Sequence, residues 1–332
     1  MERVATTPGL YPLPDDAKEA LSDLKGHQRS DLVTGDESPA VAEVYDDVRE
    51  ELITVQQEAG LDHVVEGQAR WDDMLAHPLT VHDNVRTEGI VRYYDNNNFY
   101  REPVVEGDLS FDGDVAEELT AAAELTDDLQ AVLPGPYSLF DLATDEHYGD
   151  DADFLAAVAE FLAGEAEAFP DEVETLFLPD PSLVTAPPSD GFDERVSEAL
   201  DTVAGAIDAE VITHTYWEAF DERVHAHVLD ADVDAVGYDL VSAPEESAEL
   251  VAEYGTADDV ALGLVDGQNT LVEAAATIEE RVEWFEDRVP DASAPETAYL
   301  TSNTELFYLP VNKAEAKAET LGKAADLEEV EA

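Results

Sequence analysis

The residues best suited to chemistry follow two short β-branched runs near the middle of the chain. Residues 211–213 lead into His214-Thr215-Tyr216-Trp217, and residues 233–236 lead into Gly237-Tyr238-Asp239. An amphipathic segment separates the two runs, so the order strand, helix, strand predicts a parallel βαβ unit. Such folds bind ligands at the carboxyl ends of their strands. His214 and Asp239 are therefore candidate catalytic residues, and a hydrogen-bonded structural histidine is the alternative for His214.

Two further predicted strands end in polar groups. Asp180 lies between two prolines after the run 175–178, and Tyr137 with Ser138 follows Gly135-Pro136. A glycine lets the backbone approach a ligand closely, so we expect Tyr137 and Ser138 to bind substrate or cofactor. Asp180 is a third candidate catalytic residue. A tight turn and a helix cap are the alternatives at these positions.

Side chains away from the predicted strand ends give further candidates. Segment 91–101 contains an Asn-rich turn between extended runs, which predicts a hairpin. Asp95 and Asn96 in this turn could bind the polar edge of a small ligand such as a sugar, and a solvated turn is the alternative. Lys18 is one of only 16 basic residues, and it could bind an anion or form a surface ion pair.

These candidates need a fold that gathers strand ends at one face. The hydrophobic pattern predicts strands that alternate with helices, at residues 4–7, 61–65, 130–133, 175–178, 211–213, 233–236, 259–265 and 297–300. Eight strand–helix units predict an α/β fold, a single (β/α)8 TIM barrel over residues 1–325 with an inserted hairpin around residues 77–113. Residues 326–332 are predicted to form an acidic tail.

The composition bears on partners and compartment. Against 80 acidic residues the chain has 16 basic ones, and the formal net charge is −64, which argues against nucleic acid and anionic membranes as partners. The excess of acidic residues is typical of a halophilic protein, because molar salt shortens the Debye length to ~3 Å and screens the repulsion between carboxylates. Calcium binding is the alternative, although no DxDxDG loop occurs. With no apolar run near the ~20 residues of a membrane span and no cysteine, we expect a cytoplasmic protein without disulfides.

Several strand ends, taken together, resemble the cobalamin-independent methionine synthase family over nearly the whole chain. The matching pieces are residues 6–12, 60–62, 67–68, 135–138, 180–183, 214–216 and 265–266, and then Leu306, Ala314 and Lys317. Segment 94–100 looks like the FDTNYHY signature of the family's N-terminal barrel, whereas the working zinc of full-length members belongs to their C-terminal barrel. This chain is one barrel long. The resemblance implies methyl transfer from a methyl-tetrahydrofolate or methyl-pterin to homocysteine.

The same resemblance identifies the positions where zinc would bind. In the family, a His-x-Cys pair, a Glu and a second Cys hold the zinc that turns the homocysteine thiol into a thiolate. The matching positions here are His214, Tyr216, Asp239 and Thr304. His214 and Asp239 are thus weak metal candidates, because Tyr and Thr, in the family's Cys positions, bind zinc poorly. The family implies zinc, and we expect that this chain does not bind it.

The positions that match the family's substrate contacts differ as well. The family's Gly-Glu pair reads Gly67-Gln68, and its Asp-Glu-Pro triplet reads Pro179-Asp180-Pro181. Gln68 and Tyr216 remain candidates for substrate binding. Lys18 falls where the family's Arg-x-x-Lys helix meets the glutamate tail of the folate.

We therefore expect a methyltransferase of the methionine synthase type that works with a separate zinc-bearing barrel and is inactive alone. One alternative is a non-catalytic scaffold barrel that binds a partner methyltransferase. Another is a zinc-free enzyme similar to the uroporphyrinogen decarboxylases, although the scarcity of arginine at strand ends weighs against a polycarboxylate substrate.

Overall fold

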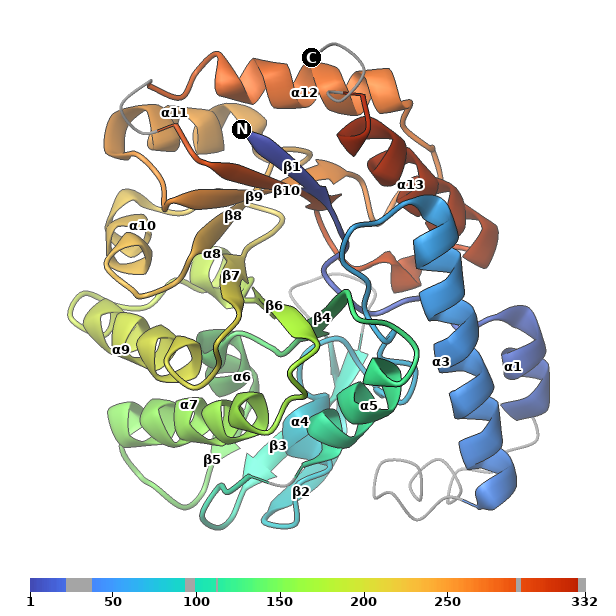
Figure 1. The fold of residues 1–332 in the computed structure, drawn as a ribbon. Helices are drawn as coiled ribbons and strands as arrows, with labels where there is room; N and C mark the ends of the chain where they lie inside the picture. The colour runs from blue at the N-terminus through green and yellow to red at the C-terminus, as the bar shows by residue number, and fades with distance from the viewer. Residues whose placement is uncertain (22–37, 93–98, 112, 291–293, 328–332) are drawn as a thin grey trace.

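The computed structural model describes residues 1–21, 38–92, 99–111, 113–290 and 294–327. Its centre is a curled parallel sheet with helices packed around the outside (Figure 1). The sheet has seven strands in the order β1-β10-β9-β8-β7-β6-β4. Their bounds are Glu2–Ala5 (β1), Leu129–Val132 (β4), Val173–Pro179 (β6), Glu210–His214 (β7), Ala235–Asp239 (β8), Asp259–Val265 (β9) and Thr297–Ser302 (β10). The predicted α/β class and barrel-type sheet are confirmed.

The second predicted strand, residues 61–65, does not form, which corrects the expected count of eight. Val64 makes a single bridge to Leu129 of β4. On the other side, the amides of Asp62 and His63 donate to the Ala5 carbonyl of β1 at 2.9 and 3.4 Å. The Asp62 carboxylate accepts the Ala5 amide at 2.7 Å, and this side-chain bond takes the place of a ladder bond. The segment therefore lies between β1 and β4, but the strand ladder does not close.

Helices follow most of the strands, as the sequence pattern predicts. Their bounds are Asp15–Leu21 (α1), Pro39–Ala59 (α3), His77–Thr80 (α4), Asp114–Ala123 (α5), Pro136–Leu142 (α6), Asp151–Glu167 (α7), Ser182–Thr185 (α8), Asp193–Ala204 (α9), Glu222–Leu229 (α10), Pro244–Tyr254 (α11), Ala275–Glu286 (α12) and Val311–Ala325 (α13), with a 3-10 turn at Leu306–Tyr308 (η2). In α3, Pro39 opens the first turn and Gly60 ends the helix with a φ of 78°. None of the helices in the described ranges is long and apolar enough to cross a membrane.

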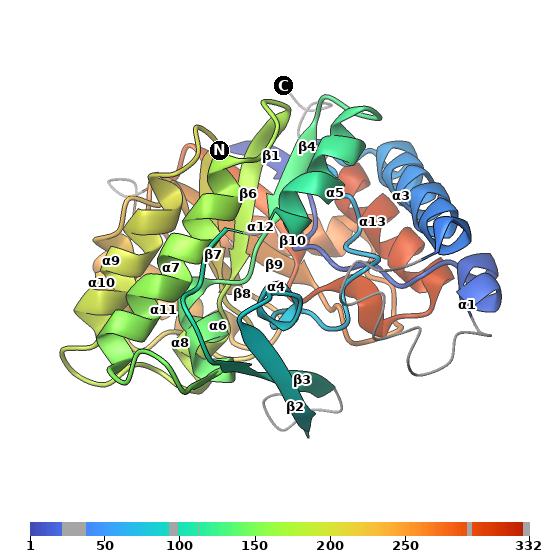
Figure 2. The same cartoon turned by 90° about the horizontal axis from the view of Figure 1, so that it is seen from below.

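The inserted hairpin is confirmed. Strand β2 (Val85–Arg92) pairs antiparallel with β3 (Phe99–Val105), and β5 (Thr144–Asp145) pairs with β3 on its other side. Figure 2 shows this small sheet projecting from the body of the molecule. The turn that carries Asp95 and Asn96 lies outside the described residues, as do residues 328–332. The roles of the turn and of the acidic tail stay predictions.

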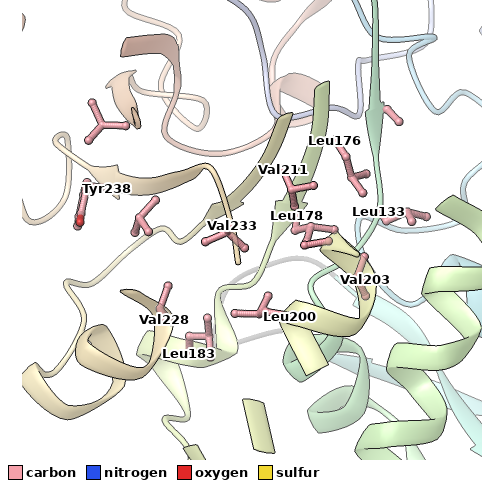
Figure 3. Packing of buried hydrophobic residues seen from close by; sticks show 14 of the residues in the cluster. Leu133, Leu176, Leu178, Leu183, Leu200, Val203, Val211, Val228, Val233 and Tyr238 are labelled. Carbon is pink, nitrogen blue, oxygen red and sulfur yellow. The ribbon is translucent and has the colours of Figure 1, made fainter. Parts of the chain in front are cut away.

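The two faces of the main sheet carry different side chains. On the outer face, Leu176, Leu178 and Val211 pack against Leu200 and Val203 of α9 (Figure 3). The inner face carries a second apolar cluster that includes Val132, Phe177, Ile212, Ala235, Ala261 and Tyr299. Side chains alternate between the two faces along a strand. His214, Asp239 and Asn303 follow members of the inner cluster by two or four residues, so they lie on the inner face at the carboxyl ends of β7, β8 and β10.

Candidate active site

His214 ends β7 and is fully buried. Its Nε2 lies 2.9 Å from the backbone carbonyl of Asn303, and because a carbonyl only accepts, Nε2 carries the proton and Nδ1 a lone pair. Nδ1 has no hydrogen-bond partner among the described residues. A Cβ at position 237 would stand 2.1 Å from Nδ1, so glycine there makes room for the ring. Burial lowers the pKa of His214, although the Asn303 carbonyl and Asp239 oppose that shift, and the imidazole is neutral.

Asp239, at the end of β8, is fully engaged by hydrogen-bond donors. Its Oδ1 accepts the amides of Val241 and Ser242, both at 2.8 Å. Its Oδ2 accepts the Trp217 amide at 2.8 Å and the side-chain amide of Asn303 at 3.1 Å. This carboxylate therefore fixes the loops after β7, β8 and β10 relative to one another.

Asn303 links these loops, and sequence reasoning did not single it out. Its Oδ1 accepts the amides of Gly267 and Thr304, both at 2.9 Å, while its backbone carbonyl holds His214. An asparagine at a strand end gives no titration or metal signal, so only the geometry reveals this role. The side chain lies among the ends of β7, β8, β9 and β10. Its oxygen and its amide nitrogen both have hydrogen-bond partners, so the side chain has one favoured orientation.

Tyr216 and Glu305 form a second buried pair beside these residues. The Tyr216 hydroxyl donates to Glu305 Oε1 at 3.1 Å, and Glu305 Oε2 has no partner among the described residues. Burial raises the pKa of Glu305 to about 8, against the opposing bonds from its own backbone amide and from Tyr216. Glu305 is thus a neutral carboxyl at pH 7. We call His214, Asp239, Asn303, Tyr216 and Glu305 the His214 cluster.

The residues present do not fit a zinc ion. Zinc in proteins needs at least three side-chain lone pairs directed at one point. In the His214 cluster both oxygens of Asp239 accept N–H groups, Tyr216 binds Glu305, and the Thr304 hydroxyl is directed at the Glu305 carbonyl at 3.4 Å. Within the described ranges, no group of three or more potential metal-binding side chains lies close enough to hold a metal.

Asp180, Ser138 and Tyr137 come together as a second site at the ends of β4 and β6. Asp180 accepts the Ser138 hydroxyl at 2.5 Å and the Ser138 amide at 2.7 Å, and the Tyr137 amide at 3.3 Å. The aspartate therefore caps the first turn of α6, the alternative that the sequence left open. Burial raises its pKa to about 7 in spite of these three bonds, so near neutral pH it can both donate and accept a proton.

Gln68 and Lys18 have different environments. Gln68 is 3% exposed and its Oε1 accepts the Leu10 amide at 2.6 Å. Lys18 on α1 is half exposed and lies 3.3 Å from Asp15, which is the surface ion pair that the sequence offered as its alternative. Its anion-binding role stays a prediction.

Three ion pairs between buried or partly buried side chains were not predicted from the sequence. Lys317 of α13, with a side chain 0% exposed, lies 2.5 Å from Glu273 and donates to the Leu271 carbonyl at 2.6 Å. Arg49 and Arg70 both pair with Glu118, at 2.6 and 2.8 Å. In a chain with so many acids, the sequence alone gives no signal for which carboxylates are buried.

Comparisons with known proteins identify the family of this chain. The family described as "Cobalamin-independent synthase, Catalytic domain" matches residues 4–294. A methionine synthase of Sulfolobus acidocaldarius is 20% identical and aligns with 92% of this chain and 86% of its own length. A 5-methyltetrahydropteroyltriglutamate–homocysteine methyltransferase of Streptomyces avermitilis is 26% identical over 79% of this chain, which spans only 34% of that relative.

Solved structures give the same fold. A B12-independent methionine synthase from Shewanella sp. W3-18-1, solved in complex with selenomethionine, superposes with a TM-score of 0.77 at 18% identity over 98% of both chains. A putative vitamin-B12 independent methionine synthase from Listeria monocytogenes gives a TM-score of 0.71 at 17% identity, covering 97% of this chain and 98% of its own. The predicted family and enzyme class, a methyltransferase of the methionine synthase type, are confirmed: the chain belongs to the cobalamin-independent synthase catalytic-domain family.

Proposed function

We propose that this chain takes part in methyl transfer from a methyl-tetrahydrofolate or methyl-tetrahydropterin to homocysteine, together with a separate zinc-bearing barrel of the same family. The names of its relatives support the reaction class. One observation carries the proposal of a partner. The positions that match the family's zinc ligands are engaged by neighbouring protein groups, so thiol activation needs a metal from elsewhere. The cytoplasm is the compartment expected for this chemistry.

The second site suits the methyl donor. Asp180 has a pKa of about 7, and a carboxyl that can donate or accept matches the mixed donors and acceptors along the edge of a pterin ring. Tyr137 and Ser138 are pinned to it through their backbone amides. In this proposal Asp180, Ser138 and Tyr137 contact the pterin, and the neutral imidazole of His214 contacts the thiol substrate.

The decarboxylase alternative is less well supported. A polycarboxylate substrate needs several unpaired cations. Arg49 lies within α3 and Arg70 follows residues 61–65, but both guanidinium groups bind Glu118. A scaffold without ligand chemistry remains the alternative that the assay must separate from the proposal.

The test is a reconstitution in molar KCl. The chain is purified alone, its metal is removed by dialysis, and methionine formation from methyl-tetrahydrofolate triglutamate and homocysteine is measured with and without the zinc-bearing barrel from the same genome. We expect no turnover from this chain alone, and faster turnover in the mixture than from the partner alone. Asp180→Asn in this chain should weaken methyl-donor binding, whereas the exposed control Asp326→Asn should not. Turnover by the metal-free chain alone contradicts the need for a partner. If the unmodified chain and the Asp180→Asn variant raise the turnover of the zinc-bearing barrel equally, the scaffold alternative is favoured.

A further inference from the structure

The amide of Gln68 is a buried polar group that no structural contact explains. Its Oε1 accepts the Leu10 amide at 2.6 Å, and only an oxygen can accept there, so the orientation of the side chain is fixed. Nε2 must then lie on the other side with its two N–H donors. It is buried and has no hydrogen-bond partner in the part of the chain that the structure describes. A buried donor without a partner is costly, and native proteins pair such a group with protein, water or a bound ligand.

The backbone around Gln68 is built to hold this orientation. Gln68 has a φ of 51° and Gly67 a φ of 98°, and a non-glycine residue in this region persists only where its surroundings enforce it. The Tyr11 amide donates to the Gly67 carbonyl at 3.1 Å, which joins the loop after β1 to this turn. A Cβ at Gly9 would stand 2.3 Å from Gln68 Oε1 and 3.1 Å from Val132. The amide therefore lies against the inner face of the sheet.

We infer that Gln68 presents two N–H donors to the ligand, so that the ligand portion bound beside residues 67–68 carries a carboxylate or carbonyl oxygen and not an ammonium group. The two N–H groups would bind one or both oxygens of a carboxylate as charge-assisted hydrogen bonds. An ammonium group has only donors, so it would leave Nε2 unpaired and place a positive charge beside the partly positive N–H groups.

The neighbouring charges agree with this polarity. Glu66 is buried, and burial raises its pKa to about 8, helped by Glu118 and opposed by Arg49 and by a bond from the Gln68 backbone. Glu66 is therefore neutral at pH 7 and supplies no negative charge for an ammonium. Since the chain as a whole carries a formal net charge of −64, its long-range field favours cations. If the chain nevertheless binds a carboxylate more tightly than an amine in molar salt, hydrogen-bond donors close to the ligand must be the cause.

The test compares two fragments of homocysteine by calorimetric titration at pH 7 in molar KCl. One is 4-mercaptobutyrate, which lacks the amino group, and the other is 3-mercaptopropylamine, which lacks the carboxylate. We expect the unmodified chain to bind the carboxylate fragment about tenfold more tightly than the amine fragment. Gln68→Glu keeps an acceptor for Leu10 but replaces both donors with an oxygen, so it should reverse the ranking. Gln268→Glu, on an exposed loop, adds the same charge and should leave the ranking unchanged.

The inference is overturned if the unmodified chain prefers the amine, binds neither fragment, or keeps its ranking in Gln68→Glu. Should that variant fail to fold, the ranking in the unmodified chain still decides. The inference rests on the proposed function only in its choice of thiol probes. A carboxylate preference without methyl transfer in the reconstituted assay supports the inference and contradicts the proposed function. Methyl transfer without a carboxylate preference supports the proposed function and contradicts the inference.

Discussion

Replacing Asn303 tests whether its side chain holds the His214 cluster together. Asn303→Ala removes three buried hydrogen bonds, from the amides of Gly267 and Thr304 at 2.9 Å and to Asp239 at 3.1 Å. At about 1 kcal/mol net for each bond, with a further penalty for buried amides left unpaired, the free energy of unfolding should fall by about 3–5 kcal/mol. That is a large part of the roughly 5–15 kcal/mol that a folded protein has.

The assay is urea unfolding in molar KCl, followed by far-UV circular dichroism and tryptophan fluorescence. Asn312→Ala, at an exposed position in the first turn of α13, is the matched control and should change stability by less than about 0.5 kcal/mol. A loss below about 1 kcal/mol for Asn303→Ala would refute the role given to this residue.

A second variant at this position predicts how the loss of stability depends on pH. Asn303→Asp keeps the acceptor oxygen but sets a carboxyl against Asp239, with the joined atoms 3.1 Å apart in the unmodified protein. Two buried carboxylates at this distance cannot both ionise, so the folded state must hold a proton and the pKa of the pair rises. A raised carboxyl pKa stabilises at low pH and loses that contribution as pH rises. The variant should therefore be closer to the unmodified protein at pH 5 than at pH 8, and the opposite trend would contradict this account.

Three further predictions concern other parts of the structure. Burial raises the pKa of Glu305 from 4.5 to about 8, so the unmodified chain should lose stability as the pH rises from about 4.5 to about 8. Glu305→Gln should remove most of that loss, and equal slopes of the free energy of unfolding against pH for the two proteins would contradict this prediction. Lys317→Met leaves Glu273 and the Leu271 carbonyl without their buried partner and should cost about 3–5 kcal/mol. The double variant with Glu273→Gln should recover part of this, and strict additivity would argue against a direct pair. With a formal net charge of −64, the chain should unfold at a lower temperature in dilute buffer than in molar KCl; an unchanged melting temperature would contradict a halophilic surface.

The sequence predicted the repeating plan of the fold because hydrophobic periodicity depends on local spacing alone. Strands β6 to β10 overlap the runs that the hydrophobic pattern predicted, although β8 is shifted towards the C-terminus, and Gly60 ends α3 as expected. Residues 61–65 failed as a strand because the Asp62 side chain bonds to the backbone of β1, and a competition of this kind is decided by tertiary contacts. The short helix α6 was also missed, since its capping carboxylate, Asp180, comes from a different strand.

The candidate site was predicted in part for the same reason. Strand ends are local features, so His214, Asp239 and Asp180 could be picked out and do lie at the ends of their strands. The bonding partners could not be foreseen, because Asn303 meets His214, and Glu305 meets Tyr216, across 89 positions of sequence. Gln68 was selected through family resemblance, whereas its fixed amide orientation follows from one bond to Leu10.

The residues of the His214 cluster bond to neighbouring protein groups and leave no site for zinc. The most direct measurement is zinc per chain by elemental analysis, after purification in molar KCl, incubation with excess zinc and dialysis against metal-free buffer. The account predicts zinc near zero, with the same result for His214→Gln. Zinc near one per chain that is lost in His214→Gln would contradict it, because the cluster would then have opened to bind the metal.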